Sequence, residues 1–333
     1  MPIEKIKSSF LQRNIHNAAV QQNINTLKEL LSQNNNTEII ENLSQWPSAS
    51  LGLRFNNHVF YGLLVLAIIL IAITFYVGFH PIFLFLTIGM FIFAFLQRKS
   101  HRDIDQIIET LKTRQLEENY HLQFFDESQP ISQALYFTNQ FPLFDLGDYD
   151  NSIKQTATGQ LNIHNKSYPF ILYQYHYINR SEDRDRNGNK SYRYDHHDLW
   201  GIFMENLPII GISISTHQKR ACRLGVKWTT SDIKFNNTAQ MSGTSEMQLA
   251  RFFTPKRILE LEKMFNDLRG DFYVHPQHSL LCWQFEKNIF ETYPSNNTLS
   301  NVHELADYLN QLRLHIFENV SQGLESLIES LDS

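Results

Sequence analysis

Hydrophobic residues are concentrated in one stretch in the first third of the chain. From Phe55 to Gln97 the sequence contains no Lys, Arg, Asp or Glu. Within it, Val59–Val77 is a nearly continuous apolar run, and a second run, Pro81–Leu96, follows at once. A transmembrane helix needs about 20 mostly apolar residues, and a helix of a soluble protein would show the polar face that these runs lack. The pattern predicts a hairpin of two transmembrane helices over residues 55–98.

Positive charge flanks this apolar pair on one side only. Arg54 precedes the first run, and Arg98, Lys99 and Arg102 follow the second, whereas the Gly78–His80 link carries no Lys or Arg. Because loops rich in Lys and Arg stay on the cytoplasmic side of a membrane, we expect both termini in the cytoplasm. The expected location is the inner, cytoplasmic membrane, with the lipid bilayer as a partner.

Helices with one apolar face are predicted on both sides of the hairpin. Residues 1–50 are rich in Asn and Gln and predict a polar helical segment. Residues 99–120 predict an amphipathic linker helix, because apolar residues recur there at helical spacing. A last amphipathic helix is expected over residues 300–333, from Val302 towards Leu331. The apolar positions of the linker helix are Ile104, Ile107, Ile108 and Leu111.

A β-rich region is predicted from about residue 120 to residue 290. Two aromatic runs, Tyr168–Ile178 and Ser191–Met204, are typical of strands. The polar segment between them, Asn179–Lys190, has Asn187 and Gly188 at its centre, and Asn-Gly between two such runs is a strong signal for a β-hairpin. Further strands are expected over the ranges Ile209–Ser215, Leu224–Trp228, Phe272–Val274 and Leu280–Phe285.

One helix is predicted inside this region, from Thr254 to Arg269. Thr254 suits the N-cap, Pro255 suits the first turn, and Gly270 suits the position after the last turn. The expected fold class is therefore α+β. It combines a two-helix transmembrane hairpin with a mostly antiparallel, β-rich cytoplasmic domain over residues 120–290 and flanking amphipathic helices.

Charge and cysteine content narrow the function classes. The formal net charge is −5, and no basic cluster of the kind that nucleic-acid binding requires is present. The two cysteines, Cys222 and Cys282, lie far apart in apolar surroundings and are expected to be reduced and buried. We therefore expect no nucleic-acid partner and no disulfide scaffold.

The order of these parts resembles a known family of bacterial membrane proteins. The stretch Ser231–Leu261 predicts a strand that carries Ala250 and Arg251, followed by two apolar residues, Thr254 and Pro255, and then a helix. This stretch and the aromatic strand pair are similar to the family numbered three-one-three-seven among domains of unknown function. The resemblance implies a short double-spanning segment followed by a cytoplasmic domain, and it implies no activity.

The densest group of chemically reactive side chains lies on the predicted aromatic hairpin. His196 and Asp198 share one face of their strand, and His176 is expected beside them on the paired strand. Three such ligands can hold zinc. The alternative is a solvated strand face that binds nothing, and we expect no cofactor.

Three weaker patterns lie nearby. The loop Asp183-x-Asp185-x-Asn187-Gly188 starts like a calcium loop, but Tyr194 stands where that loop needs Glu. Gly211-x-Ser213-x-Ser215 lacks the last Gly of a nucleophile elbow. A basic turn over residues 216–220, followed by Arg223 and Lys227, suits either solvent or anionic lipid.

Two classes of function are consistent with this sequence. The favoured hypothesis is a non-enzymatic inner-membrane protein whose cytoplasmic domain binds a protein partner or organises a complex, because no paired catalytic constellation is present. In it, Arg251 is either a plain surface residue or an anion contact. The alternative is a membrane-tethered, metal-dependent enzyme that uses His176, His196 and Asp198.

Overall fold

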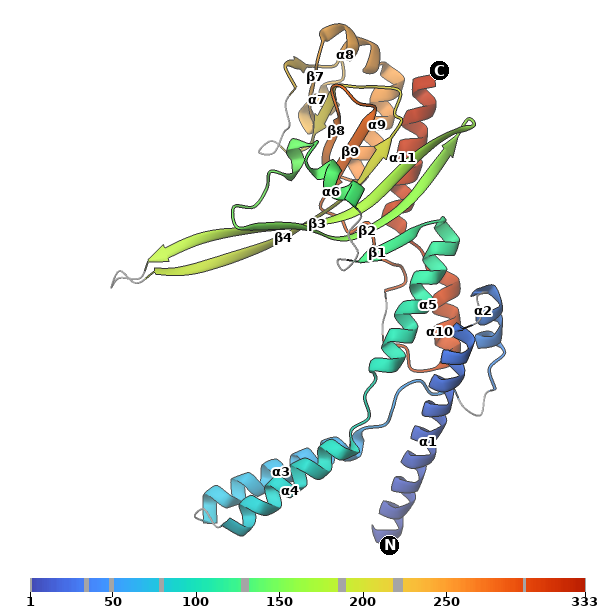
Figure 1. Ribbon diagram of the computed structural model, residues 1–333, viewed down its shortest axis with the longest axis vertical. Coiled ribbons are helices and arrows are strands. Elements are labelled where there is room, and N and C mark those ends of the chain that lie inside the picture. Colours follow the sequence, from blue (N-terminus) through green and yellow to red (C-terminus); the bar gives the residue numbers. More distant parts are fainter. Residues whose placement is uncertain are drawn as a thin grey trace. The chain divides into compact units, whose positions relative to one another are not determined.

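The protein is described by a computed structural model covering residues 2–32, 36–47, 51–77, 81–126, 132–184, 190–217, 224–295 and 298–332 (Figure 1). The chain forms two compact units. The first contains Met1–Gln115 and Asn296–Leu312, and the second contains Leu116–Ser295 and Arg313–Ser333. The fold is α+β, as predicted, and the C-terminal region is divided between the two units.

Two apolar helices of the first unit match the predicted runs closely. They are α3 (His58–Val77) and α4 (Pro81–Gln97), and both are long and apolar enough to cross a membrane by length and composition. Phe60 in the first turn of α3 packs edge-on against Phe95 in the last turn of α4, with ring centroids 5.7 Å apart. The first turn of α3 therefore lies beside the last turn of α4. The link over residues 78–80 lies outside the described residues.

The few polar side chains within these helices bond to their own backbone. Thr74 Oγ1 donates to the Leu70 carbonyl oxygen at 2.7 Å, and Thr87 Oγ1 donates to the Phe83 carbonyl oxygen at 2.8 Å. These local bonds satisfy the hydroxyl groups without any partner from another helix. Neither threonine therefore presents a free polar group on the apolar surface.

Four further helices complete the described part of the first unit. They are α1 (Pro2–Leu31), α2 (Asn36–Ser44), α5 (Arg102–Tyr120), which continues into the second unit, and α10 (Val302–Gln311). The predicted apolar face of α5 is buried, with Ile104, Ile107, Ile108 and Leu111 at most 4% exposed. Helix α10 packs against α2, and its N-cap residue Asn301 forms a β-bridge with Gly52. Helices α1 and α2 lie within the predicted segment 1–50, and α5 lies within the predicted linker 99–120.

The second unit is built around one antiparallel sheet (Figure 1). Its nine described strands follow the order β1-β2-β3-β4-β9-β8-β5-β7-β6. The long pair β3–β4 brings Tyr173 opposite Gly201 and His176 opposite Asp198. The strands are β1 (Gln123–Asp126), β2 (Asp150–Ile163), β3 (Lys166–Arg184), β4 (Lys190–Glu205), β5 (Ile212–Ser215), β6 (Val226–Trp228), β7 (Gln240–Gly243), β8 (Gly270–Val274) and β9 (Leu280–Phe285).

Helices cover one face of this sheet. Phe265 of α9 (Pro255–Asp267) packs edge-on against Trp283, with ring centroids 5.9 Å apart. Phe317 of α11 (His315–Asp332) lies 5.6 Å from Phe170. Gly323 of α11 allows close packing on Met264 of α9, because a Cβ there would come within 2.8 Å of that side chain. This layer covers Trp283, the largest of the fully buried side chains.

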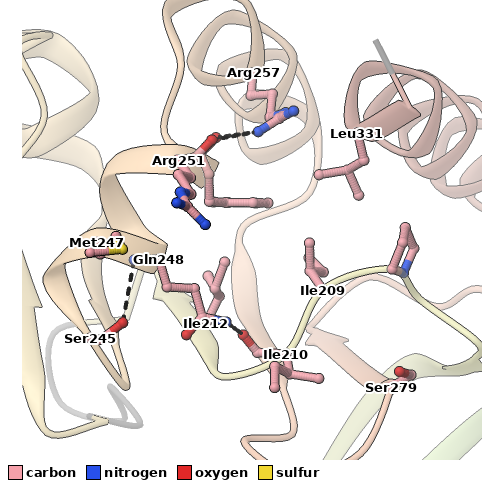
Figure 2. Close-up of a pocket in the computed structure, with 12 residues that line it drawn as sticks. Ile209, Ile210, Ile212, Ser245, Met247, Gln248, Arg251, Arg257, Ser279 and Leu331 are labelled. Carbon is pink, nitrogen blue, oxygen red and sulfur yellow. Dashed lines mark hydrogen bonds between the residues drawn. The ribbon is translucent and has the colours of Figure 1, made fainter.

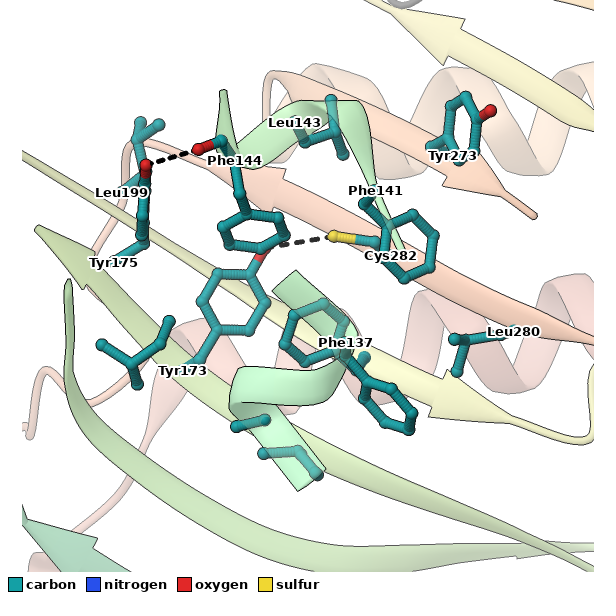
Figure 3. Close-up of a cluster of buried hydrophobic side chains, with 14 of the residues drawn as sticks. Phe137, Phe141, Leu143, Phe144, Tyr173, Tyr175, Leu199, Tyr273, Leu280 and Cys282 are labelled. Atoms are coloured by element: carbon teal, nitrogen blue, oxygen red, sulfur yellow. Dashed lines mark hydrogen bonds between the residues drawn. The ribbon is translucent and has the colours of Figure 1, made fainter. Parts of the chain in front are cut away.

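The opposite face carries a second cluster of buried aromatic residues (Figure 3). Tyr173 stacks on Phe203 with ring centroids 4.5 Å apart. Phe137 from α6 (Ser132–Thr138), Phe141 from the following segment and Phe144 from the 3-10 turn η1 (Pro142–Phe144) pack on this pair. Cys282 is fully buried in this cluster, as predicted, with its Sγ 3.3 Å from the Tyr173 hydroxyl. Cys222 lies outside the described residues.

Several predicted boundaries are wrong, for identifiable reasons. The expected strand Ile209–Ser215 begins only at Ile212, because Gly211 adopts a left-handed conformation with φ +63. The predicted single helix over residues 300–333 is two helices, because the segment between α10 and α11 is extended and Arg313 forms a β-bridge with Tyr293.

Two further corrections concern the hairpin and the helix after Pro255. The predicted loop Asn179–Lys190 is shorter, since β3 continues to Arg184 and pairs with Lys190. Helix α9 ends at Asp267, with Leu268 as its C-cap. Gly270 instead starts β8, where a Cβ would overlap the Gln284 carbonyl oxygen of the neighbouring strand. Close strand packing, and not helix capping, therefore explains this glycine.

Candidate functional site

A cavity of about 650 Å³ lies in the second unit (Figure 2). Four separate segments supply its walls: the loop before β5, the short helix α8 (Glu246–Phe252), the first turn of α9 and the C-terminal end of α11. Ser279, from the turn between β8 and β9, lies at its edge. The apolar lining side chains are Pro208, Ile209, Ile210, Ile212, Met247, Phe252 and Leu331.

Helix α8 is where the sequence predicted a strand, and this changes the position of Arg251. Ser245 is the N-cap, and its Oγ accepts a hydrogen bond from the Gln248 amide at 3.3 Å. The Gln248 side chain donates to the Ile210 carbonyl oxygen and accepts from Thr244 Oγ1. These bonds tie α8 to the loop before β5. Arg251 therefore extends from the last turn of a fixed helix.

Arg257, in the first turn of α9, is fully occupied by structural hydrogen bonds. Its Nη1 donates to the carbonyl oxygen of Arg251 at 2.7 Å and to that of Phe252 at 3.2 Å. Its Nε and Nη2 donate to the Ser330 carbonyl oxygen at 3.1 and 2.9 Å. A cation at a helix C-terminus also interacts favourably with the helix dipole. Burial lowers the pKa of the Arg257 guanidinium from its ordinary value, and its role is to join the ends of α8 and α11.

Arg251 differs from Arg257 in having no such partner. Its guanidinium makes no hydrogen bond and no ion pair with any side chain in the part of the chain that the structure describes. It is exposed, and Figure 2 shows it beside the apolar wall formed by Ile210 and Ile212. An unpaired guanidinium binds carboxylates in a bidentate manner. Of the two guanidinium groups that line the cavity, the one of Arg251 therefore remains available to a ligand next to apolar walls.

Exposed apolar side chains around the cavity also indicate a binding site. Met247 is 66% exposed and Ile210 is 40% exposed, although both line the cavity. Apolar side chains that stay exposed around one concave site are typical of binding surfaces. Methionine adapts its shape to different partners. The arrangement suits a ligand with a carboxylate next to an apolar group.

The structure also brings together the three predicted metal ligands. His176 Nδ1 lies 3.0 Å from Asp198 Oδ1, and His176 Nε2 lies 3.2 Å from His196 Nδ1. Asp198 and His196 thus lie on opposite edges of the His176 ring, and the three side chains form a row joined by hydrogen bonds. Among the described residues, no group of three or more His, Cys, Asp or Glu side chains is arranged to hold a metal ion.

The remaining sequence patterns fall partly outside the described residues. These include positions 185–189 of the calcium-like loop and positions 218–223 of the basic turn. Ser213 and Ser215 lie on β5, which pairs with β7 and β8, so they have no strand-turn-helix context. Ser215 Oγ instead donates to Asp271 inside the sheet. Both serines are therefore part of the sheet and not of a nucleophile elbow.

No protein-family model, curated protein or solved structure matches this chain. The sequence pattern indicates Arg251 as a candidate anion contact, but it predicts this residue on a strand and gives no sign of the cavity. Its other walls come from segments as distant as Ile210 and Leu331, which nothing in the local sequence connects.

Proposed function

We propose that this protein is anchored in the inner membrane by α3 and α4 and that its second unit binds a protein partner on the cytoplasmic side. The observation that supports the anchor is the uncovered apolar surface of these two helices. Ile68 is 58% exposed, and Phe85 and Leu96 are each 73% exposed. Soluble monomers rarely expose an apolar patch of more than a few hundred Å².

A lipid environment explains this surface better than a covering protein would. Exposed apolar residues occur along the full length of both helices, and no charged residue interrupts them. Each buried CH₂ group contributes about 0.8 kcal/mol when removed from water, so leaving both helices in water is strongly unfavourable. The positive charges at Arg54, Arg98 and Lys99 support an orientation with both termini in the cytoplasm.

The partner is proposed to dock in the cavity beside Arg251. A carboxylate of the partner would pair with the unpartnered guanidinium, and a neighbouring apolar side chain would enter between Ile210 and Met247. The arrangement provides charge recognition and apolar burial together, and such anchors commonly dominate binding energy at interfaces. The second unit would then act as a membrane-tethered binding module.

Topology is tested with reporter fusions to the full chain. Fusions at Lys112 and at the C-terminus are expected to report a cytoplasmic location, and the protein is expected to stay in the membrane pellet after alkaline carbonate washing. A periplasmic signal from either fusion would refute the orientation. Release by carbonate would refute the anchor.

Partner binding is tested by capture from detergent extracts with matched variants. Arg251→Glu reverses the charge at the cavity, whereas Arg269→Glu makes the same change at an exposed arginine outside it. We expect a partner that the wild type and Arg269→Glu recover reproducibly and Arg251→Glu loses. Equal recovery by all three proteins would rule out the cavity as the docking site, and no reproducible partner under several conditions would argue against the binding module.

The second candidate function is a membrane-tethered, metal-dependent enzyme. It is kept because the structure does place His176 beside both Asp198 and His196. A carboxylate that orients a histidine is common around metal sites. The assignment of this chain to the family of two-span membrane proteins with a cytoplasmic domain of unknown function stays a prediction.

A further inference from the structure

The junction between α4 and α5 in the first unit forms a second concave site. Its volume is about 550 Å³. Tyr61 of α3 contributes one wall, the segment Arg98–His101 contributes another, and the start of α5 closes it. This site lies where the apolar surface of α3 and α4 ends, because α3 begins at His58 and α4 ends at Gln97.

Hydrogen bonds to other segments of the first unit hold this junction in place. Asn57 Nδ2 donates to the Lys99 carbonyl oxygen, and the Lys99 amide donates to Asn57 Oδ1, both at 3.0 Å. The Phe55 amide donates to His101 Nε2 at 3.1 Å. Arg13 donates to Gln97 Oε1 at 3.1 Å and to the Gln97 carbonyl oxygen at 2.9 Å. The site is thus preorganised, which lowers the entropic cost of binding.

Three cations at this site have no carboxylate partner. Within the residues that the structure describes, no ion pair involves Arg98, Lys99 or Arg102. The Arg98 guanidinium lies over the Phe60 ring, 5.7 Å from its centroid. All three side chains are exposed. The ring contact orients Arg98 but leaves its charge uncompensated.

The acidic residues that line the same site are already neutralised by other cations. Asp105 Oδ1 pairs with Arg54 Nη1 at 2.6 Å, and Glu109 Oε2 pairs with Lys112 Nζ at 3.2 Å. Neither Arg54 nor Lys112 lines the cavity. The field inside the site is therefore dominated by the three unpaired cations, and it favours an anion.

We propose that this junction binds the headgroup of an anionic phospholipid. The inference rests on the proposed membrane insertion, which places residues 98–102 at the level of the lipid phosphates. Arginine holds phosphate oxygens in a bidentate manner, so Arg98 and Arg102 receive the phosphate. Tyr61 is 63% exposed in the first turn of α3 and provides an amphipathic ring of the kind found at membrane interfaces. The acyl chains then lie along the exposed apolar side chains of α3 and α4.

The experiment uses the full chain in neutral detergent, where orientation in a bilayer plays no part. Native mass spectrometry measures binding of phosphatidylglycerol and of phosphatidylcholine, added in equal amounts. The test variant is Arg98→Gln/Lys99→Gln/Arg102→Gln. The control variant, Arg193→Gln/Lys263→Gln/Arg269→Gln, makes the same charge change at exposed positions in the second unit.

We expect the wild type and the control variant to prefer phosphatidylglycerol. In the test variant this preference should fall by about tenfold or more, because each basic residue near a membrane surface contributes to anionic lipid binding. Equal preference in all three proteins, or none in the wild type, would overturn the proposal. Displacement of the lipid by millimolar inorganic phosphate would also overturn it, because the ligand would then be free phosphate.

Two measurements separate this inference from the proposed anchor. If the wild type resists carbonate extraction but shows no lipid preference, the headgroup site fails and the anchor stands. If carbonate releases the wild type, the anchor itself fails. The single substitution Arg98→Gln, which leaves two cations in place, is expected to fold normally and to show an intermediate loss of preference. An unchanged preference in that variant, together with an unchanged preference in the triple variant, counts against the site.

Discussion

The guanidinium of Arg257 donates to the carbonyl oxygen of Arg251 at 2.7 Å, so one arginine fixes the end of the helix that presents the other. The two residues lie in neighbouring helices and have opposite roles. Arg257 makes four hydrogen bonds to backbone carbonyl groups of the second unit. Arg251 contributes only its backbone to this arrangement and keeps its side-chain charge available.

Arg257→Ala is expected to lower the unfolding free energy of the second unit by about 2–3 kcal/mol, because hydrogen bonds from a charged donor are lost and carbonyl groups are left unpaired. Arg251→Ala is expected to change it by less than about 0.5 kcal/mol, as is usual for an exposed side chain. Denaturant unfolding of the full chain measures both. The full chain is used because α10, which lies between residues of the second unit in sequence, packs on α2 of the first. Equal losses in the two variants would show that Arg251 is also structural.

Phe265→Ala is expected to cost roughly 3–5 kcal/mol of stability, because removal of a buried aromatic side chain leaves a cavity. Phe265 is 4% exposed and packs edge-on against both Phe272 and Trp283. Leu259→Ala, on the exposed side of the same helix, is the matched control and should cost far less. The shift in denaturation midpoint measures the difference. Similar midpoints for the two variants would contradict the packing of α9 on the sheet.

Stability of the second unit is expected to fall at alkaline pH. Burial, together with the hydrogen bond that its hydroxyl donates to Glu318 at 2.6 Å, raises the pKa of Tyr120 to about 12. Because the folded state holds this proton more tightly than the unfolded state, the contribution is complete below about pH 10 and is lost as pH rises towards about 12. Burial likewise raises the pKa of Tyr175 to about 12.

Thermal unfolding between pH 8 and pH 12 measures this dependence, at values chosen to bracket about pH 10, the ordinary tyrosine pKa. In Tyr120→Phe the midpoint should fall less steeply between about pH 10 and 12. The residual slope is due to Tyr175 and to Tyr173, because burial raises the pKa of both. The exposed Tyr136 serves as the control, since Tyr136→Phe should leave the slope unchanged. Identical slopes for the wild type and Tyr120→Phe would contradict the assignment.

A single charge in the middle of α3 is expected to impair membrane insertion. Ile68 lies near the centre of this helix and is 58% exposed. Arginine at the centre of a transmembrane helix costs about 2.5–3.5 kcal/mol on insertion scales, so Ile68→Arg should reduce the carbonate-resistant fraction clearly. Phe75→Arg places the same charge in the last turns, where the side chain can reach the interface, and should have a smaller effect. If both variants stay fully in the membrane fraction, the spanning assignment of α3 is wrong.

Elemental analysis of the purified full chain tests the metal hypothesis. If His176, His196 and Asp198 bind a metal, close to one equivalent should be found, and His196→Ala should remove it. The row of hydrogen bonds seen here uses both ring nitrogens of His176. A protein that is folded normally and carries no transition metal would exclude the enzyme alternative.

The sequence predicted well where one local property decides the structure. The charge-free runs predicted α3 and α4 to within a residue at most ends, because helix formation there depends on composition alone. The apolar spacing from Ile104 to Leu111 predicted the buried face of α5. Thr254 accepts a hydrogen bond from the Arg257 amide as the N-cap of α9, as expected from the Thr-Pro start.

The sequence failed where a neighbouring segment decides the conformation. The strand β2, over Asp150–Ile163, was not predicted, because its polar residues form a strand only through pairing with β1 and β3. Arg251 was assigned to a strand because α8 is short and its start signal, the N-cap Ser245, is too common a residue to predict a helix by itself. Gly270 was assigned to a helix end. The actual reason for a glycine there is that a side chain would overlap the Gln284 carbonyl oxygen on β9.

Sequence alone determined the apolar helices, their flanking charges and the α+β class, because hydrophobicity and charge are properties of each segment by itself. Only the tertiary structure decided which arginine is free. Arg251 and Arg257 are six residues apart and indistinguishable by type. The fold places the carbonyl groups of Phe252 and Ser330 around Arg257 and an apolar cavity beside Arg251. The availability of a charge depends on what the chain brings next to it, and for Arg257 that partner lies 73 residues further along the sequence.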